Sequence, residues 1–479
     1  MLFNSVQFLL FFIFVYGLYL VLGHRWQNRL LIVASCLFYS AWNWKFLGVM
    51  FLSITTDYFC SRYMGRSDDP RHRKALLFLS LFVNLGVLGF FKYYNFFIGN
   101  LTALLDIMLP FKVPSLALRI VLPLGISFYT FEAISYTVDV YKRTIKPATS
   151  YWDYLLFVIY FPHLIAGPIM RAKDFLPQIV APRQMDRSKF THGAYLVFLG
   201  LFQKIFVADN MAKIVNPVFN QPGNAHGADI LIAMYAFTFQ IFGDFAGYSN
   251  MARGLSLMMG FAIAVNFHTP FFATSVQDFW NRWHISLSQW IRDYLYLPLM
   301  WGLRRVKGND RLCLALLIAM SAMGLWHGAA WNFVLFGVYY GVLLVLYLIV
   351  IRINFATLVV PKTPWGTQAW FWLRVVFVFH LTVLGMTIFR CHSLTQRQSV
   401  LGGLFFNAHP STMNMGNLMD FIALALPLLA LQWMEFYTQD IFFILKRHWL
   451  VTNCALAFMA CLLLAWGVIK EEEFIYFQF

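Results

Sequence analysis

The chain has 479 residues, of which 60% are hydrophobic, 19% aromatic and only 12% charged. Because a soluble domain carries about 25% charged residues, this composition indicates an integral membrane protein and leaves no long polar stretch for a separate soluble domain. The 36 Lys and Arg residues against 21 Asp and Glu give a net charge of +15. These basic residues cluster between apolar runs, as in the cytoplasmic loops of membrane proteins, so we assign them to membrane topology and not to nucleic-acid binding.

The cysteines show no paired spacing, and most lie within apolar runs, where a thiol packs as a small hydrophobic group. They are Cys36, Cys60, Cys313, Cys391, Cys454 and Cys461. We expect neither a disulfide framework nor a metal site. The N-terminal apolar run lacks a basic leader and a cleavage site with small residues, so we expect it to be retained as the first span.

Apolar runs of 14 to 21 residues recur along the whole chain. They lie at 6–22, 30–44, 46–60, 75–94, 119–138, 192–208, 229–248, 312–325, 331–351, 370–389, 418–436 and 450–468. Since a transmembrane helix needs about 20 apolar residues, we expect an all-α, polytopic membrane helix bundle of about eleven or twelve spans, forming one domain over residues 1–479. Segments rich in Pro, Gly and Asn at 102–117, 216–227, 360–368 and 395–416 are expected to be loops.

Two further segments are expected to enter the protein without crossing it cleanly. The segment 151–171 contains Pro162 and Pro168, which break helical hydrogen bonding, so a re-entrant hairpin is predicted there. The segment 278–298 is too polar to face lipid but has an apolar face at helical spacing. We therefore place it at the cytoplasmic interface or in the protein interior, where irregular backbone is tolerated if it is buried or lines water.

Of the twelve histidines in this membrane-like chain, His284 and His327 are the two main candidates for function. An ionisable side chain at bilayer depth costs about 2.5 to 3.5 kcal/mol on insertion scales, so such residues are candidates for function. An imidazole can take a proton from a hydroxyl group as that oxygen attacks a thioester. The residues alone leave three roles open for His327: catalysis, a structural hydrogen bond to a backbone carbonyl, or metal ligation. For His284 the alternative is an interfacial polar residue.

The surroundings of His327 favour a catalytic role. Gly324 and Gly328 flank it and permit close approach of helices, and Trp326 and Trp331 are expected to supply apolar walls. His163 and His380 are expected to be buried histidines with structural hydrogen bonds.

Five ordered motifs resemble those of the membrane-bound O-acyltransferases, and most closely the bacterial alginate O-acetyltransferase branch, which includes the D-alanyl transferase of teichoic acid. They are LPLGISFYTFEAISYTVDVY from Leu122, FPHLIAGPIMR from Phe161, FGDFAGYSNMARGLSLMMGF from Phe242, NRWHISLSQWIRDYLYLP from Asn281 and LWHGAAWNFVLFG from Leu325. The resemblance extends to the closing FIYFQF and so covers essentially the whole chain. One departure is PLMWGLRRVKGND, which stands where that branch has a glycine-rich stretch after DYLY.

The resemblance implies a helix bundle around a central funnel in the bacterial inner membrane. It implies transfer of an acetyl group from acetyl-CoA, with no bound cofactor, to a hydroxyl of an extracytoplasmic polysaccharide such as alginate, directly or through a partner protein. In this chain His327 would accept the proton of the hydroxyl, and His284 would orient or polarise the thioester carbonyl.

Further candidate substrate contacts follow from this resemblance. Asp244 and Tyr248 would suit the wall of a tunnel, although helix packing through Gly243 and Gly247 explains that segment equally well. Cationic residues after the DYLY segment, Arg304 and Arg305 among them, would pair with the phosphates of coenzyme A, with positive-inside bias as the alternative.

The C-terminal EEEFIYFQF follows the last expected span. Its aromatic residues predict an anchor at the membrane interface. The family resemblance instead implies that the tail docks an extracytoplasmic, hydrolase-like partner protein that completes transfer to the polymer.

Two other functions remain open from the sequence. One is a transporter of an acylated intermediate, since polar residues on broken helices also occur in transporters, but no inverted internal repeat supports it. The other is an O-acyltransferase that acts on a lipid or protein hydroxyl.

Overall fold

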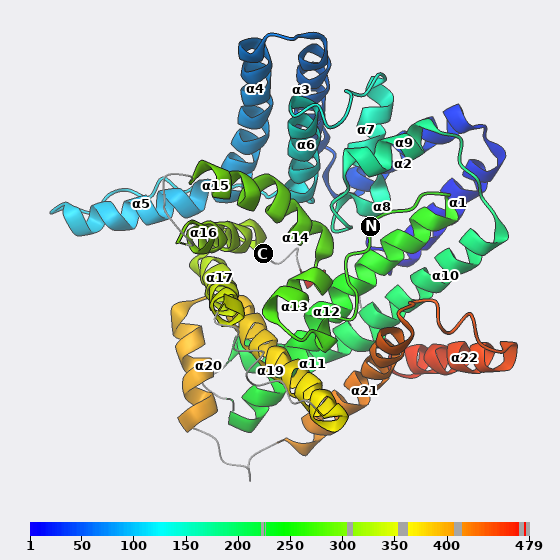
Figure 1. Ribbon diagram of the computed structural model, residues 1–479, viewed down its shortest axis with the longest axis vertical. Coiled ribbons are helices and arrows are strands. Elements are labelled where there is room, and N and C mark those ends of the chain that lie inside the picture. Colours follow the sequence, from blue (N-terminus) through cyan, green and yellow to red (C-terminus); the bar gives the residue numbers. More distant parts are fainter. Residues whose placement is uncertain are drawn as a thin grey trace. The chain divides into compact units, whose positions relative to one another are not determined.

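The computed structural model describes residues 1–221, 225, 227–303, 310–352, 363–406, 414–468 and 474–475 (Figure 1). Within these ranges all regular elements are helices, which confirms the all-α prediction. Seven helical stretches of the described chain are long and apolar enough to cross a membrane: Pro70–Met108, Arg187–Asn220, Gly227–Met258, Trp331–Arg352, Pro364–Arg390, Met415–Thr438 and Trp449–Trp466. The protein is therefore a multi-pass membrane protein.

The chain packs into two compact units. Unit 1 comprises Met1–Tyr195 and Ala252–Ala264, and unit 2 comprises Leu196–Met251 and Val265–Phe479. The helices of unit 1 are α1 (Val6–Val21), α2 (His24–Asn43), α3 (Phe46–Arg66), α4 (Pro70–Leu88), η1 (Gly89–Tyr93), α5 (Tyr94–Met108), α6 (Ile126–Tyr141), α7 (Tyr151–Ile159), α8 (Phe161–Leu164) and α9 (Ala172–Val180), with α10 (Arg187–Leu201) at the boundary. The prediction of a single membrane domain stays a prediction.

Polar groups hold unit 1 together inside its apolar core, where α3, α4 and α6 lie side by side (Figure 1). The Asp57 carboxylate of α3 accepts hydrogen bonds from Ser80 and Asn84 of α4. His163 follows Pro162 in the short helix α8. It is buried, and its ring lies 3.1 Å from the Glu132 carboxylate of α6. The predicted structural role of His163 is confirmed, and the helix breaks predicted between residues 151 and 171 are present as the short helices α7 and α8.

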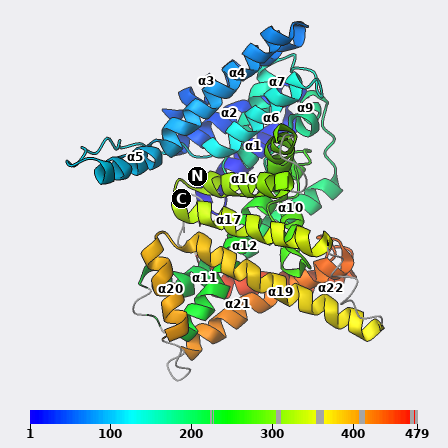
Figure 2. The same cartoon turned by 60° about the vertical axis from the view of Figure 1, so that its left-hand side comes forward.

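Unit 2 carries the segments singled out in the sequence. Its elements are η2 (Phe202–Ala208), α11 (Asp209–Asn220), α12 (Gly227–Met258), η4 (Pro270–Phe272), α13 (Val276–Arg282), α14 (Ile285–Ile291), η5 (Arg292–Tyr296), α15 (Leu297–Gly302), α16 (Asp310–His327), α17 (Trp331–Arg352), α19 (Pro364–Arg390), α20 (Leu394–Phe406), α21 (Met415–Thr438) and α22 (Trp449–Trp466). Helix α12 continues past Met251 into unit 1. Helices α16, α17 and α19 lie side by side (Figure 2).

Three helical stretches of the described chain contain short π-helical turns, in which backbone hydrogen bonds join residues five positions apart. These turns are η1 between α4 and α5, η2 between α10 and α11, and η5 between α14 and α15. Each contains one cationic residue: Lys92, Lys204 and Arg292, respectively.

Several expected boundaries are wrong. The loop predicted at 102–117 is helical as far as Met108, and much of the loop predicted at 395–416 is helix α20, because the first helix-breaking prolines of these segments, Pro110 and Pro410, come only after the helical residues. Part of the loop predicted at 360–368 lies outside the described residues, and α19 begins at Pro364. His380 is exposed on α19, where Nδ1 bonds the Val376 carbonyl, so its predicted burial is wrong.

The hairpin of α16 and α17 depends on glycine. A Cβ at Gly324 would collide with the Phe333 carbonyl oxygen, and one at Gly337 would collide with the Met320 carbonyl oxygen. Small residues allow this backbone approach, and such packing replaces the hydrophobic effect as the force that joins helices in lipid. The hairpin positions His327, the last residue of α16.

We predict that Gly337→Ala lowers the free energy of unfolding by about 1 to 3 kcal/mol, because the backbone atoms of α16 that its Cβ would meet cannot move aside as a flexible side chain can. The measurement is thermal unfolding of the protein in detergent or lipid nanodiscs. Gly402→Ala on α20 is the matched control, since nothing lies within 4 Å of its added Cβ. It should be neutral or stabilising by up to about 1 kcal/mol. Equal losses in the two variants would contradict the packing argument.

Candidate functional site

His284 lies at a sharp corner between α13 and α14. Its φ of 44° and ψ of 54° are left-handed, a conformation that bulky residues rarely adopt and that is enriched at functional sites. The side chain is 0% exposed. The interfacial reading of His284 is therefore wrong, and the placement of this segment in the protein interior is confirmed for its central residue.

Asn266 fixes the corner from the segment that follows α12. Its carbonyl oxygen accepts from the Ile285 amide at 2.9 Å. Its side-chain oxygen accepts from the Ser286 amide at 3.3 Å and the Ser286 hydroxyl at 2.8 Å, while its amide group donates to the Ser249 hydroxyl at 3.2 Å. Because these groups are buried, loss of any partner would leave an unpaired polar atom that costs about 1 to 3 kcal/mol.

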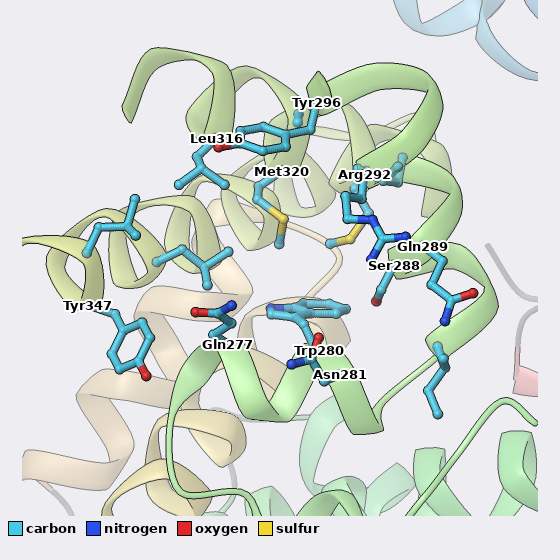
Figure 3. Close-up of a pocket in the computed structure, with 16 residues that line it drawn as sticks. Gln277, Trp280, Asn281, Ser288, Gln289, Arg292, Tyr296, Leu316, Met320 and Tyr347 are labelled. Atoms are coloured by element: carbon cyan, nitrogen blue, oxygen red, sulfur yellow. The ribbon is translucent and has the colours of Figure 1, made fainter. Parts of the chain in front are cut away.

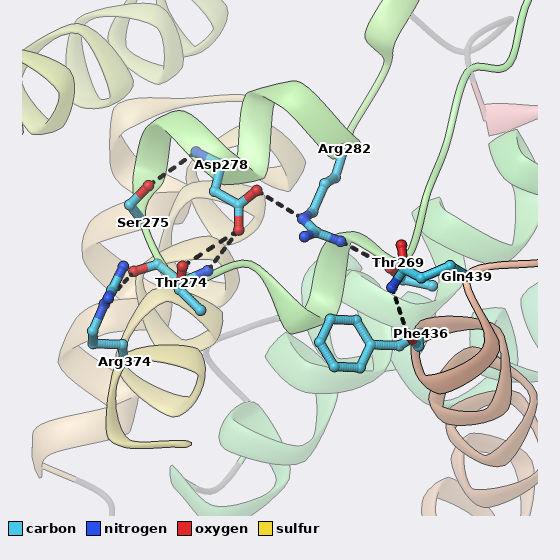
Figure 4. Close-up of polar contacts among 8 residues, drawn as sticks. All are labelled: Thr269, Thr274, Ser275, Asp278, Arg282, Arg374, Phe436 and Gln439. Carbon is cyan, nitrogen blue, oxygen red and sulfur yellow. Dashed lines mark hydrogen bonds and ion pairs between the residues drawn. The ribbon is translucent and has the colours of Figure 1, made fainter. Parts of the chain in front are cut away.

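A second polar network holds α13, the helix before the corner (Figure 4). The Asp278 carboxylate accepts from Arg282 Nε at 2.8 Å and from the Thr274 amide at 3.0 Å. Arg282 also donates to the Thr269 hydroxyl, and Arg374 of α19 donates to the Thr274 carbonyl, both at 3.0 Å. Asp278 and Arg282 thus have partners within the protein, whereas Gln289 and Arg292 of the same segment are exposed.

The structure brings the two histidines together. The ring centroids of His284 and His327 are 6.4 Å apart. His327 is buried, and its ring packs edge-on against Phe389 at 5.3 Å and Phe336 at 5.8 Å. Trp326 packs against both histidines, at 4.9 Å from His327 and 5.9 Å from His284.

The two ring nitrogens of His284 are available for hydrogen bonding. Neither Nδ1 nor Nε2 has a hydrogen-bond partner among the described residues, and the nearest ring is Phe245, edge-on at 4.5 Å. Burial, and to a lesser extent the neighbouring His327, lowers the pKa of the His284 imidazole well below its ordinary value, so the ring is neutral at pH 7. A buried neutral imidazole offers one N–H donor and one acceptor to a ligand.

A cavity of about 300 Å³ lies within unit 2, lined by residues of α13, α14, η5, α16 and α17 (Figure 3). It is lined by Gln277, Trp280, Asn281, Ile285, Ser288, Gln289, Ile291, Arg292, Tyr296, Leu316, Ala319, Met320, Met323, Leu344, Tyr347 and Leu348. Neither histidine lines it, but Ile285 follows His284 directly and Met323 lies one helical turn before His327.

The cavity wall is amphipathic. Amide and hydroxyl side chains come from α13 and α14, and aliphatic side chains come from α16 and α17. The buried indole N–H of Trp280 has no acceptor among the described residues. Buried donors nearly always have partners in native structures, so this cavity suits a ligand with carbonyl groups and an apolar body.

The other residues predicted to contact substrate differ in burial and in their distance from the histidines. Trp326 lies in the histidine site, whereas Trp331, at the start of α17, is 57% exposed. Asp244 is buried and lies 2.8 Å from Lys204, and the Tyr248 ring lies 5.2 Å from Phe474.

Arg304 and Arg305 lie outside the described residues. The alternative explanation for the Asp244 segment is also supported, since a Cβ on Gly247 would lie 2.7 Å from the Gly200 carbonyl oxygen. Of the C-terminal tail, Phe474 and Ile475 are described, and both are buried. The Phe474 ring packs on Tyr248 and Phe245 inside unit 2, so this residue is not an exposed interfacial anchor. The predicted docking of a partner protein by the tail stays a prediction.

Three residues of the site were missed in the sequence. Asn266 lies in a segment without a motif, and its role comes from contacts distant along the chain. Trp280 lies in the 278–298 segment but was not singled out within it. Lys204 did carry a signal, because it is a lone cation within the apolar run at 192–208 and such residues usually pair with a carboxylate.

Comparison with known proteins gives consistent matches. Residues 8–388 match the model of the membrane-bound O-acyltransferase family (MBOAT). The chain is 37% identical over 409 residues to the probable alginate O-acetylase AlgI of Pseudomonas putida, covering 85% of this chain and 80% of that protein. It is 32% identical to the peptidoglycan O-acetyltransferase of Helicobacter pylori, covering 84% and 80%, and 30% identical to the teichoic acid D-alanyltransferase of Bacillus subtilis, covering 56% and 68%.

The matched region contains both histidines, the corner that holds His284 and the glycine-packed hairpin that ends at His327. The family model, the O-acetyltransferase relatives and the apolar helices agree on a membrane-bound acyltransferase. The chain belongs to the membrane-bound O-acyltransferase family.

Proposed function

We propose that the protein transfers an acetyl group from acetyl-CoA to a hydroxyl of an extracytoplasmic polysaccharide. The observation that carries the proposal is the buried pair His284 and His327, 6.4 Å apart beside an amphipathic cavity. The relatives named for alginate and peptidoglycan O-acetylation support a polysaccharide acceptor. The proposal includes a bacterial inner-membrane location and about eleven or twelve spans around a central funnel.

In the proposed reaction His327 accepts the proton of the acceptor hydroxyl as that oxygen attacks the thioester carbonyl carbon. The C–S bond then breaks, the coenzyme A thiolate leaves, and the proton returns from His327 to that sulfur. His284, neutral and without a protein hydrogen-bond partner among the described residues, donates its N–H to the carbonyl oxygen as negative charge develops there. A positioned base of this kind contributes about 10²-fold to 10⁴-fold.

The cavity beside the histidines is proposed to hold the pantetheine arm of acetyl-CoA. That arm has amide carbonyls and an apolar dimethyl group, which match the Trp280 N–H, the neighbouring amide side chains and the aliphatic wall. Arg304 and Arg305 remain proposed partners of the coenzyme A phosphates.

The acceptor is the least constrained part of the proposal. The relative named as a teichoic acid D-alanyltransferase is similar over 56% of the chain, so acceptor profiling should include teichoic acid and lipid or protein hydroxyls beside alginate. Running the assay with the purified protein alone separates direct transfer from transfer through a partner protein. Docking of an extracytoplasmic partner protein by the C-terminal tail remains part of the proposal, although Phe474 and Ile475 themselves are buried.

We predict that His327→Gln lowers acetyl transfer by about 10²-fold to 10⁴-fold while the protein still folds, because glutamine keeps hydrogen bonding but cannot accept a proton at neutral pH. The measurement is turnover of labelled acetyl-CoA in proteoliposomes with a polysaccharide acceptor. His380→Gln on α19 is the matched control, and its turnover should equal that of the parent. A His327→Gln variant with parental turnover would overturn the proposed role.

A second prediction concerns the donor cavity. Trp280→Phe removes the indole N–H together with one of the two fused rings that line the cavity, so it should raise the KM for acetyl-CoA by about fivefold or more, the value of at least one buried hydrogen bond, with little change in kcat. Trp365→Phe is the control, because Trp365 is 89% exposed. An unchanged KM in Trp280→Phe would show that the donor does not occupy this cavity.

A further inference from the structure

Unit 2 contains a buried cluster of three charges, Lys204, Asp209 and Asp244. The Lys204 ammonium lies 2.8 Å from a carboxylate oxygen of Asp209 and 2.8 Å from one of Asp244. The three side chains are at most 7% exposed. A buried charge is tolerated only when it is paired and its remaining lone pairs are hydrogen-bonded. With two carboxylates for one ammonium, Asp244 needs a further donor.

That donor comes from the other end of the chain. The backbone N–H of Ile475 donates to the second carboxylate oxygen of Asp244 at 2.7 Å, across 231 positions of sequence. Ile475 is buried, and the ring of Phe474 is 2% exposed. Phe474 packs on Tyr248, one helical turn beyond Asp244 on α12, with ring centroids 5.2 Å apart.

We propose that Lys204, Asp209 and Asp244 form a binding site for the protein's own C-terminal segment, hereafter the tail seat. Asp244 fixes the backbone of the segment at Ile475, and Lys204 holds Asp244 in place with Asp209 as its second counter-ion. This gives Asp244 a role distinct from the wall of a substrate tunnel.

The seated segment also contacts the surroundings of the histidine pair. The Phe474 ring lies 6.0 Å from that of Phe245, and the Phe245 ring lies 4.5 Å edge-on from His284. Since His284 has no hydrogen bond from the described chain to fix its ring, the packing of Phe245 is one of the contacts that orient it. Phe474 is therefore a positioning residue that acts through Phe245, a step that rests on the proposed function.

The tail seat can be tested without an activity measurement. The cysteines that are not buried, Cys36, Cys313, Cys454 and Cys461, are replaced by alanine, and Ile475→Cys is introduced as a reporter. In this parent the new thiol should be protected from a membrane-impermeant maleimide, because position 475 is buried in the seat.

Asp244→Ala and Asp209→Ala are matched variants in that background. Each removes one carboxylate from Lys204, but only Asp244 accepts the hydrogen bond from residue 475. We expect maleimide labelling to accelerate by about tenfold or more in Asp244→Ala and by less than about twofold in Asp209→Ala, because exposure of a protected group follows the free energy of local opening.

Equal labelling in the two variants, or rapid labelling in the parent, would overturn the tail seat. If either alanine variant fails to fold, as judged by size-exclusion chromatography, the pair Asp244→Asn and Asp209→Asn makes the same comparison with less loss of packing. Loss of acetyl transfer in Asp244→Ala with the thiol still protected would instead assign Asp244 to the substrate path and would also overturn the seat.

Coupling to catalysis is tested with Phe474→Ala and Phe474→Leu. We expect Phe474→Ala to lower kcat by about tenfold with the KM for acetyl-CoA within about twofold, because a misoriented catalytic group affects the reaction step more than donor binding. Phe474→Leu, which refills the space, should restore most of kcat. A parental kcat in Phe474→Ala would overturn the coupling. Absence of acetyl transfer in the parent protein would overturn the proposed function alone, since thiol protection is read independently.

Discussion

The left-handed corner at His284 is the constraint on which the site depends. A histidine does not adopt this backbone conformation without support, and the support comes from Asn266 on one side and from the Asp278–Arg282 network on the other. Both sets of bonds are buried or partly buried, where polar groups interact strongly because water does not compete. The corner ends α13, starts α14, and turns the His284 ring toward Phe245 and Trp326.

The second histidine is placed by a different kind of interaction. His327 ends a helix whose position is set by glycine-mediated contact between α16 and α17. The site thus combines a corner held by hydrogen bonds with a hairpin held by close packing. The cavity is lined by residues of both, with amide and hydroxyl side chains from α13 and α14 and aliphatic side chains from α16 and α17.

Much of this architecture could be predicted from sequence because the signals are local. The apolar runs at 331–351, 370–389 and 450–468 lie within or nearly coincide with α17, α19 and α22, since hydrophobicity over about 20 residues reports a membrane helix directly. The motifs around His284 and His327 marked both residues. The helix break at His284 was not predicted, because side-chain periodicity continues across it and the partner that permits it, Asn266, lies in a segment without a motif. The burial of Phe474 was not predicted for a similar reason. Aromatic residues at the end of a membrane protein predict an interfacial anchor, and the residues of α12 that contact Phe474 are distant in sequence.

The π-helical turns make the position of the side chains within them sensitive to the number of residues in the turn. A regular α-helix advances about 100° per residue, and a π-helical turn accommodates about one extra residue without changing the direction of the helix on either side. Lys204 occupies such a turn in η2 and meets two carboxylates, one of them on another helix. Because the turn absorbs the extra residue, deleting one residue from η2 would restore a regular α-helix with little rotation of its flanks, but it would shift the side chains inside the turn and so draw Lys204 away from its two carboxylates.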